Sequence, residues 1–216
     1  MAQHAYVPLN EHAHSGHTKL LALVGSSMRV LDVGCSSGYL ARPLVATGCT
    51  VVGLELDPRA AEEAREVCEE VLVGDVETME LPFEPASFDV VLCGDLIEHL
   101  RDPGAFLTRV RPLLRPGGHL VLTTPNVANW AMRLGLLVGR WRYTELGILD
   151  RTHTHLFTRA TLAETLERAG YRVETLDFTV PLPALRSAAT ERAAHAIGRL
   201  RPSLFAYQFV VSATPA

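Results

Sequence analysis

An apolar run that ends in a glycine-bounded turn constrains the fold of this chain more than any other feature. Residues 29–40 read Arg-Val-Leu-Asp-Val-Gly-Cys-Ser-Ser-Gly-Tyr-Leu, which predicts a buried strand, a turn and the start of a helix. In a parallel α/β sheet, such a turn lies at the edge where ligands bind. Gly34 lets bare backbone approach a ligand, and Gly38 lets the helix begin close to the sheet. An ordinary turn without a ligand is the alternative, and the rest of the chain must decide between the two.

The sequence after this turn alternates between apolar strands and helical patterns as far as residue 124. We expect strands at Val30–Val33, Thr50–Leu54, Val71–Val73, Phe88–Cys93 and His119–Thr124. Helices are predicted at Tyr39–Ala46, from Pro58 onward and at Pro103–Leu114. A further helix is expected at Arg159–Ala169, and two further strands at Arg172–Phe178 and Leu204–Val211. Near-continuous apolar strands joined by helices indicate a parallel sheet that is covered on both faces.

Composition narrows the class of protein. The formal net charge is −4 and no cluster of Lys and Arg stands out, so we do not expect nucleic-acid binding. The N-terminus lacks the basic start and apolar run of a signal peptide, and no window reaches the ~20 apolar residues that a transmembrane helix needs. The cysteines have no zinc or redox spacing, so we expect reduced thiols and a cytoplasmic protein. They are Cys35, Cys49, Cys68 and Cys93.

Acidic residues follow the ends of successive predicted strands. Asp32 lies at the end of the first strand and Glu55 follows the second. Asp75 and Asp95 follow the third and the fourth. The carboxyl ends of parallel strands meet at one edge of a sheet, so we expect these carboxylates to lie along one crevice. Each acid alone would be read as a helix cap or a surface charge, but their order favours a binding site for a cofactor with a ribose.

The order of these motifs resembles that of the class I S-adenosylmethionine-dependent methyltransferases over about residues 28–180. Residues 30–38 resemble the first motif of the family, Gly74-Asp75-Val76 its adenine-contacting step and residues 88–99 its fourth motif. Leu114–Gly118 resembles the turn before strand five, and residues 153–158 are similar to a segment of the ubiquinone-biosynthesis O-methyltransferases. The resemblance implies a Rossmann-like α/β fold with a seven-stranded, mostly parallel sheet, helices on both faces and an antiparallel last strand.

The resemblance also implies S-adenosyl-L-methionine as the cofactor and a small molecule as the methyl acceptor. The loop spacing agrees, because Gly-x-x-x-Gly does not match the Gly-x-Gly-x-x-Gly of dinucleotide sites. Ser36 departs from the family, whose loop usually has a glycine at that place. Asp32 would face the ammonium group of the cofactor, and Glu55 would bind the ribose. The expected cofactor-binding residues are Asp32, Gly34, Cys35, Ser36, Gly38, Glu55, Leu56, Asp75, Val76, Cys93 and Asp95.

Histidines near the predicted crevice are candidates for a catalytic base. In-line methyl transfer to an oxygen or nitrogen needs a base only if the acceptor must lose a proton. His99 is the first candidate because it follows the fourth strand, and His153 and His155 are the second. No metal is expected, since Asp150, His153 and His155 offer only two histidines, one residue apart.

Segments outside the alternation belong to what we expect to be a single domain over residues 1–216. Residues 1–25 are predicted to be a lead-in and a short helix, and 181–202 a helical insertion before the last strand. Residues 127–157 are predicted to be a lid and acceptor pocket. An extra core helix and a helix on a membrane surface are the alternatives. The lead-in histidines could bind metal but lack a ligand spacing; they are His4, His12, His14 and His17.

Other functions fit the same pattern. The main alternative is a non-catalytic, methyltransferase-like binding protein, toward which Ser36 is the only hint. A nucleotide-dependent oxidoreductase on a similar sheet is the second, and the loop spacing argues against it. The sequence does not reveal the oligomeric state, so a homodimer stays open.

Overall fold

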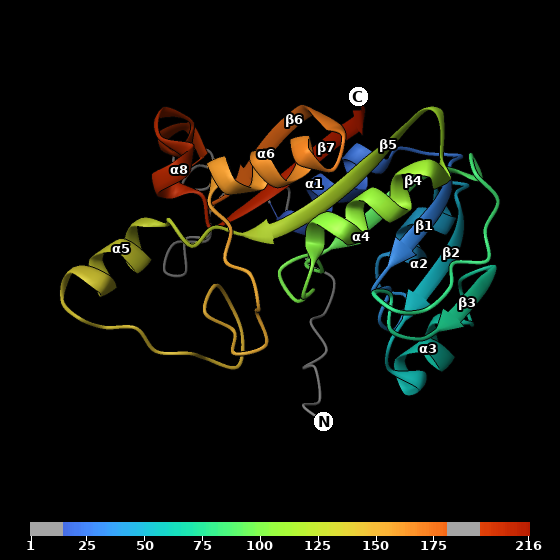
Figure 1. The fold of residues 1–216 in the computed structure, drawn as a ribbon, viewed down its shortest axis with the longest axis horizontal. Helices are drawn as coiled ribbons and strands as arrows, with labels where there is room; N and C mark the ends of the chain where they lie inside the picture. Colours follow the sequence, from blue (N-terminus) through green and yellow to red (C-terminus); the bar gives the residue numbers. More distant parts are fainter. Residues whose placement is uncertain (1–14, 181–194) are drawn as a thin grey trace.

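The computed structural model describes residues 15–180 and 195–216, which form one seven-stranded sheet with helices on both of its faces (Figure 1). The strands are β1 Arg29–Val33, β2 Thr50–Glu55, β3 Glu70–Val73, β4 Phe88–Gly94, β5 Leu114–Pro125, β6 Tyr171–Thr179 and β7 Gln208–Pro215. The helices are α1 Gly16–Val24, α2 Ala41–Ala46, α3 Pro58–Ala64, α4 Pro103–Val110, α5 Trp130–Leu137, α6 Arg159–Arg168 and α8 Pro202–Phe205. This confirms the predicted α/β class.

The strand order is β3-β2-β1-β4-β5-β7-β6. The first five strands pair in parallel, whereas β7 is antiparallel to both β5 and β6. The predicted antiparallel last strand is therefore confirmed, and it lies between two strands that precede it in the chain. The carboxyl ends of β1, β2 and β4 face one edge of the sheet, where the predicted crevice lies.

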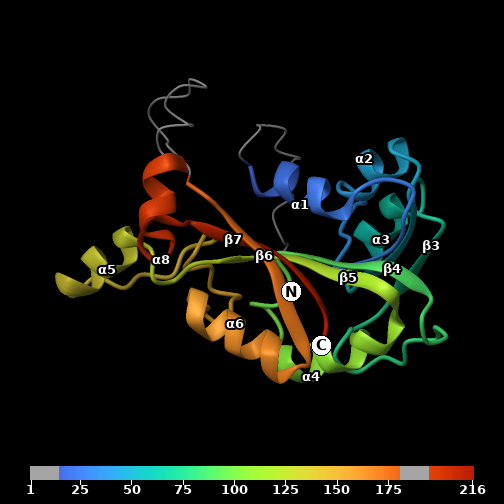
Figure 2. The same ribbon diagram turned by 90° about the horizontal axis from the view of Figure 1, so that it is seen from above.

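Two hydrophobic clusters cover the two faces of the sheet (Figure 2). Helices α1, α2 and α3 pack on one face through small and branched side chains such as Leu20, Leu44 and Ala64. Helices α4 and α6 pack on the other face through side chains such as Phe106 and Leu162. Burial of this apolar surface on both faces is the main free-energy gain of such a fold.

Several predicted bounds were wrong for local reasons. The helix predicted over Pro103–Leu114 ends at Val110, because Pro112 has no N–H to continue it, and a 3₁₀ turn follows. The last strand begins at Gln208 rather than at Leu204, because Pro202 starts the short helix α8. Helix α2 begins at Ala41 rather than at Tyr39, after a series of turns.

Residues 127–157 and 181–202 lie outside the alternation of strands and helices, and the structure describes all of the first but only a part of the second. Helix α5 is shorter than residues 127–140, since Asn129 caps its start and Gly139, at φ +68°, follows its end. Most of the predicted insertion 181–202, and the lead-in before Ser15 with three of its histidines, lie outside the described residues. Within 15–180 and 195–216, no helix combines the length and the apolar character needed to cross a bilayer.

Candidate functional site

The loop after β1 is shaped by two glycines in the left-handed region. Gly34 has φ +74°, and its N–H and that of Cys35 both donate to the carbonyl of Leu54 at the end of β2. Gly38 has φ +75°, and a Cβ there would come within 3.2 Å of the Ala64 backbone. Side chains would therefore strain both positions, and the loop is held against β2 and α3 as the glycine pattern predicts.

Glu55 connects the ends of β1 and β2. Its Oε2 accepts a hydrogen bond of 2.7 Å from the Ser36 N–H. Its Oε1 accepts from the N–H groups of Leu56 and Asp57 at 2.8 and 2.9 Å. Ser36 itself has φ +49°, so the residue that departs from the family pattern adopts the conformation that a glycine would favour. The predicted ribose-binding acid thus lies directly beside the glycine loop.

Asp32 is a buried carboxylate with an unsatisfied oxygen. Its side chain is 1% exposed, and Oδ2 has no hydrogen-bond partner within the described residues. Burial, and then the charge of Glu55, raise the pKa of Asp32 to about 7. A cationic group placed beside this oxygen would remove the cost of burying it. The ammonium group of S-adenosylmethionine is such a cation, so the residues present fit the expected cofactor.

The residues expected to contact adenine follow the ends of β2 and β3. Asp75 caps its own turn by accepting from the Glu77 N–H at 2.9 Å, and Val76 packs in the core. Leu56 is 64% exposed, although it is a large apolar residue. An exposed leucine beside the Glu55 carboxylate is available to contact a flat apolar ring.

Asp95 is held by side chains of β5 and β7, the two strands that follow β4 in the order of the sheet. Its Oδ1 accepts from the Thr123 hydroxyl of β5 at 3.0 Å and from the side-chain amide of Gln208 at the start of β7. The backbone N–H of Asp95 donates to the Thr123 hydroxyl oxygen at 2.9 Å. The carboxylate predicted after β4 is therefore held in place by residues far away in the sequence.

The two cysteines predicted to touch the cofactor are core residues. The Cys93 side chain is 0% exposed, so its thiol lies within the core. Burial raises the pKa of Cys93 well above its ordinary value. The Cys35 side chain packs against the backbone of Gly53, where a Cβ would meet its sulfur at 2.6 Å.

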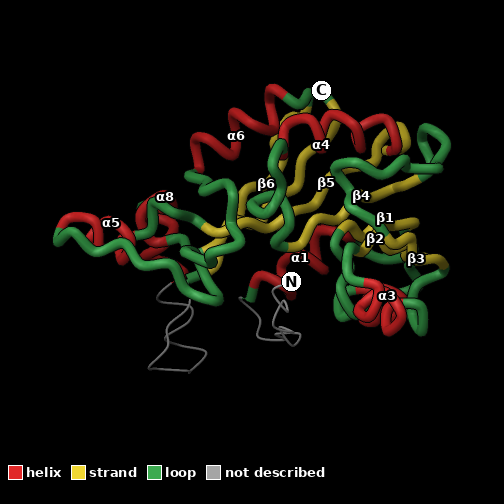
Figure 3. The backbone as a smooth tube through the Cα atoms, turned by 60° about the horizontal axis from the view of Figure 1, so that its bottom comes forward, coloured by secondary structure: helices red, strands yellow, loops and turns green. Residues whose placement is uncertain are grey.

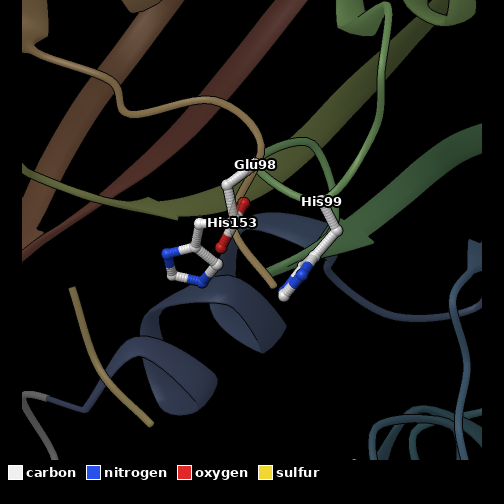
Figure 4. A group of neighbouring side chains, drawn as sticks. All are labelled: Glu98, His99 and His153. Atoms are coloured by element: carbon white, nitrogen blue, oxygen red, sulfur yellow. The ribbon is translucent and has the colours of Figure 1, made fainter. Parts of the chain in front are cut away.

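Glu98, His99 and His153 bring their side chains together beside the end of β4 (Figure 4). One ligand atom from each lies within 4.8 Å of the others. Glu98 is 1% exposed, and neither of its oxygens makes a hydrogen bond of ordinary geometry with described residues. Burial, and then the charge of Asp95, raise the pKa of Glu98 well above its ordinary value. Carboxylate and imidazole groups in this arrangement could hold a divalent cation.

Thr152 links His99 to Asp150. The Thr152 hydroxyl donates to Asp150 Oδ1 at 2.6 Å, which uses its only proton. Its oxygen lies 3.1 Å from Nδ1 of His99 and therefore accepts from an Nδ1–H. Burial opposes ionisation of Asp150, but the hydroxyl and amide of Thr152 outweigh it and lower the pKa of Asp150. Neutral His99 consequently carries its lone pair on Nε2.

The segment that carries Thr152 is tied to the backbone after β4. The N–H groups of Thr154 and His155 both donate to the Glu98 carbonyl, at 2.8 and 3.0 Å. His153 places Nδ1 at 3.1 Å from the Ile148 carbonyl, and its ring lies 4.7 Å from that of His99. The side chains of His99 and His153 are therefore neighbours in the structure.

His155, the other second candidate for a base, lies apart from this group. Its Nδ1 is 2.9 Å from the Leu100 carbonyl, and its ring stacks on Phe157. The metal set weighed from the sequence is not assembled either, because Asp150 binds Thr152 while His155 faces Leu100. Residues two apart would share a face of a regular extended segment, so the separation of His153 from His155 follows from the irregular path of residues 151–158.

Sequence reasoning missed several residues of the site. Glu98 precedes His99 directly, and its place in an Asp-x-x-Glu-His run was a usable signal. Tyr39 lies among the carboxylates: burial, then Asp95 and Asp32, raise its pKa. The His17 ring of α1 lies 5.3 Å from the Tyr39 ring, so the lead-in helix borders the crevice. No local sequence pattern indicated that His17 or Gln208 lies beside the crevice.

The fold and the carboxylates along its edge define an S-adenosylmethionine methyltransferase type of site. A family model described as a methyltransferase domain matches residues 9–176. The chain therefore belongs to this methyltransferase family, which confirms the class predicted from the sequence, with S-adenosylmethionine as cofactor.

Relatives of known name extend the comparison. The chain is 32% identical over 160 residues to a ubiquinone biosynthesis O-methyltransferase of Xanthomonas euvesicatoria, covering 71% of this chain and 66% of that one. It is 29% identical to the protein of that name in Acinetobacter baylyi, covering 68% and 65%. A probable S-adenosylmethionine-dependent methyltransferase of Mycolicibacterium smegmatis is 34% identical, covering 67% and 52%. The matches thus span between about half and two thirds of the length of these relatives.

Solved structures with the same fold include an S-adenosylmethionine-dependent methyltransferase of Thermotoga maritima, described as a possible histamine N-methyltransferase. Its TM-score is 0.67 at 19% identity, over 93% of this chain and 88% of that one. A methyltransferase of Haloferax volcanii in complex with its Trm112 activator has a TM-score of 0.65 at 24% identity, over 95% and 91%. At these identities the likeness concerns the fold.

Proposed function

We propose that this chain transfers the methyl group of S-adenosylmethionine to a hydroxyl group of a small molecule. The observation that carries the proposal is the pairing, on one sheet edge, of an unsatisfied Asp32 oxygen with an oriented His99 imidazole. The first suits a cationic cofactor and the second suits an acceptor that must lose a proton. Relatives named O-methyltransferases favour oxygen as the nucleophile, with nitrogen as the next choice.

Binding of the cofactor would rest on the acids of the first two strand ends. Asp32 would pair with the ammonium group, and Glu55 would accept hydrogen bonds from the ribose hydroxyls. The bare backbone of the loop from Gly34 to Gly38 leaves room for the methionine end. When bound, the cofactor supplies an electrophilic methyl group on a sulfonium sulfur.

His99 would act as the base on the acceptor side. Because Thr152 accepts from its Nδ1–H, Nε2 carries the lone pair that takes the proton of the acceptor hydroxyl. Asp150 holds Thr152 in turn and favours the imidazolium that forms when His99 takes the proton. His153, held by the Ile148 carbonyl, would line the same side of the acceptor pocket.

A second role for the same cluster is favoured by Glu98. Its two oxygens are buried without ordinary hydrogen bonds next to His99 and His153. A divalent cation held by these three residues would neutralise the buried carboxylate and lower the pKa of an acceptor hydroxyl. In that case His99 would be a ligand of the metal rather than the base.

The test combines binding and transfer. Calorimetry with S-adenosylmethionine should show binding that is lost in Asp32→Ala. Labelled methyl groups should appear in a hydroxylated product when the chain is incubated with pools of small molecules. Binding without transfer to any pool would favour the non-catalytic alternative, and absence of binding would overturn the proposal.

The four described cysteines are all free, which supports a reducing compartment such as the cytoplasm.

A further inference from the structure

Helix α5 and the loop after it form an exposed apolar arm, defined here as residues 130–146. None of the eight residues of α5 is buried, although most of them are apolar. The helix extends away from the sheet at one end of the molecule (Figures 1 and 3). The large apolar side chains that the arm exposes are Trp130, Leu134, Leu136, Leu137, Val138, Tyr143 and Leu146. An apolar surface of this kind on a soluble domain marks a contact site.

The arm is positively charged, whereas the chain as a whole is negative. Residues 127–144 contain Arg133, Arg140 and Arg142 and no acid, although the chain has a net charge of −4. Glu145, the first acid beyond them, is paired with Arg151 at 2.8 Å. Within the described residues, neither Arg140 nor Arg142 forms an ion pair. These guanidinium groups are therefore available to anionic groups outside the chain.

The helical residues 195–200 add to this surface at the same end of the molecule (Figures 1 and 2). Ile197 is 52% exposed and Leu200 is 78% exposed. Arg199 and Arg201 are exposed as well, and residues 195–216 contain no acid. The base of α5 is fixed to the segment that follows, because the Asn129 side chain donates to the Ala206 carbonyl at 2.9 Å. Two neighbouring elements thus present the same combination of apolar and basic side chains.

We propose that the arm docks on the surface of a bilayer that contains anionic lipids. A helix that lies in the interface buries apolar side chains at the boundary of the headgroups and places arginines on the phosphates. The aromatic side chains of Trp130, Trp141 and Tyr143 suit this boundary, where one end of the ring is apolar and the other is wet. The arm provides each of these features on one exposed segment.

Charge argues against a second copy of the chain as the occupant. A two-fold contact would place the arm of one copy against the same arm of the other, and the arginines would face each other. A bilayer with anionic headgroups instead complements them. Because Asp150 and Thr152 follow the arm closely in the chain, docking would hold the acceptor side of the molecule close to the lipid surface.

Vesicle flotation with the full chain tests this proposal. Vesicles of phosphatidylcholine alone and vesicles with one part in three of phosphatidylglycerol are compared at low and at high salt. We expect the chain to float with the anionic vesicles, and at least tenfold less with the neutral ones or at high salt. No flotation of the unmodified chain with anionic vesicles would overturn the proposal, as would equal binding to both vesicle types.

Matched variants locate the surface. Leu137 is 82% exposed, so Leu137→Glu should fold normally and lose at least tenfold in anionic vesicle binding. Arg140→Gln combined with Arg142→Gln should lose binding while leaving the apolar side chains in place. Val45 on α2 is 40% exposed, and Val45→Glu is the control that should bind like the unmodified chain. Unchanged binding by both arm variants would overturn the proposal. So would a concentration-dependent dimer, seen by sedimentation without flotation, that Leu137→Glu dissociates.

Discussion

The Thr152 hydroxyl oxygen lies 3.1 Å from Nδ1 of His99, although 53 positions separate the two residues. Because the hydroxyl proton goes to Asp150, the contact selects one tautomer of the imidazole. The same contact holds the 150–155 segment over the end of β4. A single threonine thereby controls both the position and the protonation pattern of the candidate base.

Thr152→Val keeps the shape of the side chain and removes the hydroxyl. We expect the turnover number to fall by about 10- to 100-fold, because His99 loses the group that orients it. The KM for the cofactor should hardly change, since Thr152 is on the acceptor side. Thr152→Ser restores the hydroxyl and should recover most of the turnover. Equal losses in the Val and Ser variants would point to packing instead of orientation.

Cofactor affinity should depend on pH through Asp32. Its pKa of about 7 means that the carboxyl is partly protonated near neutrality, whereas pairing with an ammonium group requires the ionised form. We expect the Kd to rise toward lower pH, by up to about tenfold per pH unit below 7, and to level off above it. Calorimetry in buffers of different ionisation enthalpy should detect a released proton. Asp32→Asn should bind weakly and without this pH dependence.

The same carboxyl predicts how stability varies with pH. A pKa raised from 3.8 to about 7 means that the folded state binds the proton more tightly than the unfolded state does. The contribution of Asp32 to stability is therefore complete below about pH 4 and is lost as the pH rises to about 7. The loss is at most about 4 kcal/mol. Chemical denaturation should show Asp32→Asn losing less stability than the unmodified chain between pH 4 and 8, measured without cofactor.

Ser36 offers a test of backbone strain in the glycine loop. The φ of Ser36, +49°, costs a non-glycine residue about 1–2 kcal/mol of conformational free energy, and a glycine would avoid this cost. A glycine would also be more flexible in the unfolded chain, which lowers stability relative to serine by up to about 1 kcal/mol. Ser36→Gly should therefore raise the free energy of unfolding by about 0.5–1 kcal/mol. It should keep the bond to Glu55, which the backbone makes. Ser37 does not have a positive φ, so Ser37→Gly should instead lower stability.

Metal addition separates the two roles of His99. If Glu98, His99 and His153 bind a divalent cation, Mn²⁺ should raise the Tm of metal-stripped protein, and a chelator should reverse the shift. Glu98→Gln should abolish this shift in Tm, because glutamine has the shape and the neutrality of protonated Glu98 but lacks the carboxylate that would bind the metal. His155→Ala is the control, because His155 faces the Leu100 carbonyl and should leave the shift intact. Absence of any shift in the unmodified protein would leave His99 as the base.

Local patterns were enough to predict the sheet and the edge at which Asp32 and Glu55 lie. The acids after β1 and β2 are close to the loop because parallel strands end together, which is why Asp32 and Glu55 could be placed from spacing alone. The acceptor side could not be derived in this way. Thr152 meets His99 and Gln208 meets Asp95 across long loops, and the direction of His155 depends on the path of an irregular segment. The burial of the Cys93 thiol depends in the same way on the packing of the sheet, which the apolar run of β4 does not specify.

The position of β7 between β5 and β6 has a consequence for how the chain is made. Residues 208–215 pair with both neighbours, so the edge of β5 stays unpaired until nearly all of these 216 residues have left the ribosome. Gln208, which holds Asp95, arrives with the same strand. Until β7 has been made, a nascent chain therefore exposes a long apolar strand edge, the kind of surface that chaperones cover, and leaves Asp95 without its partner Gln208.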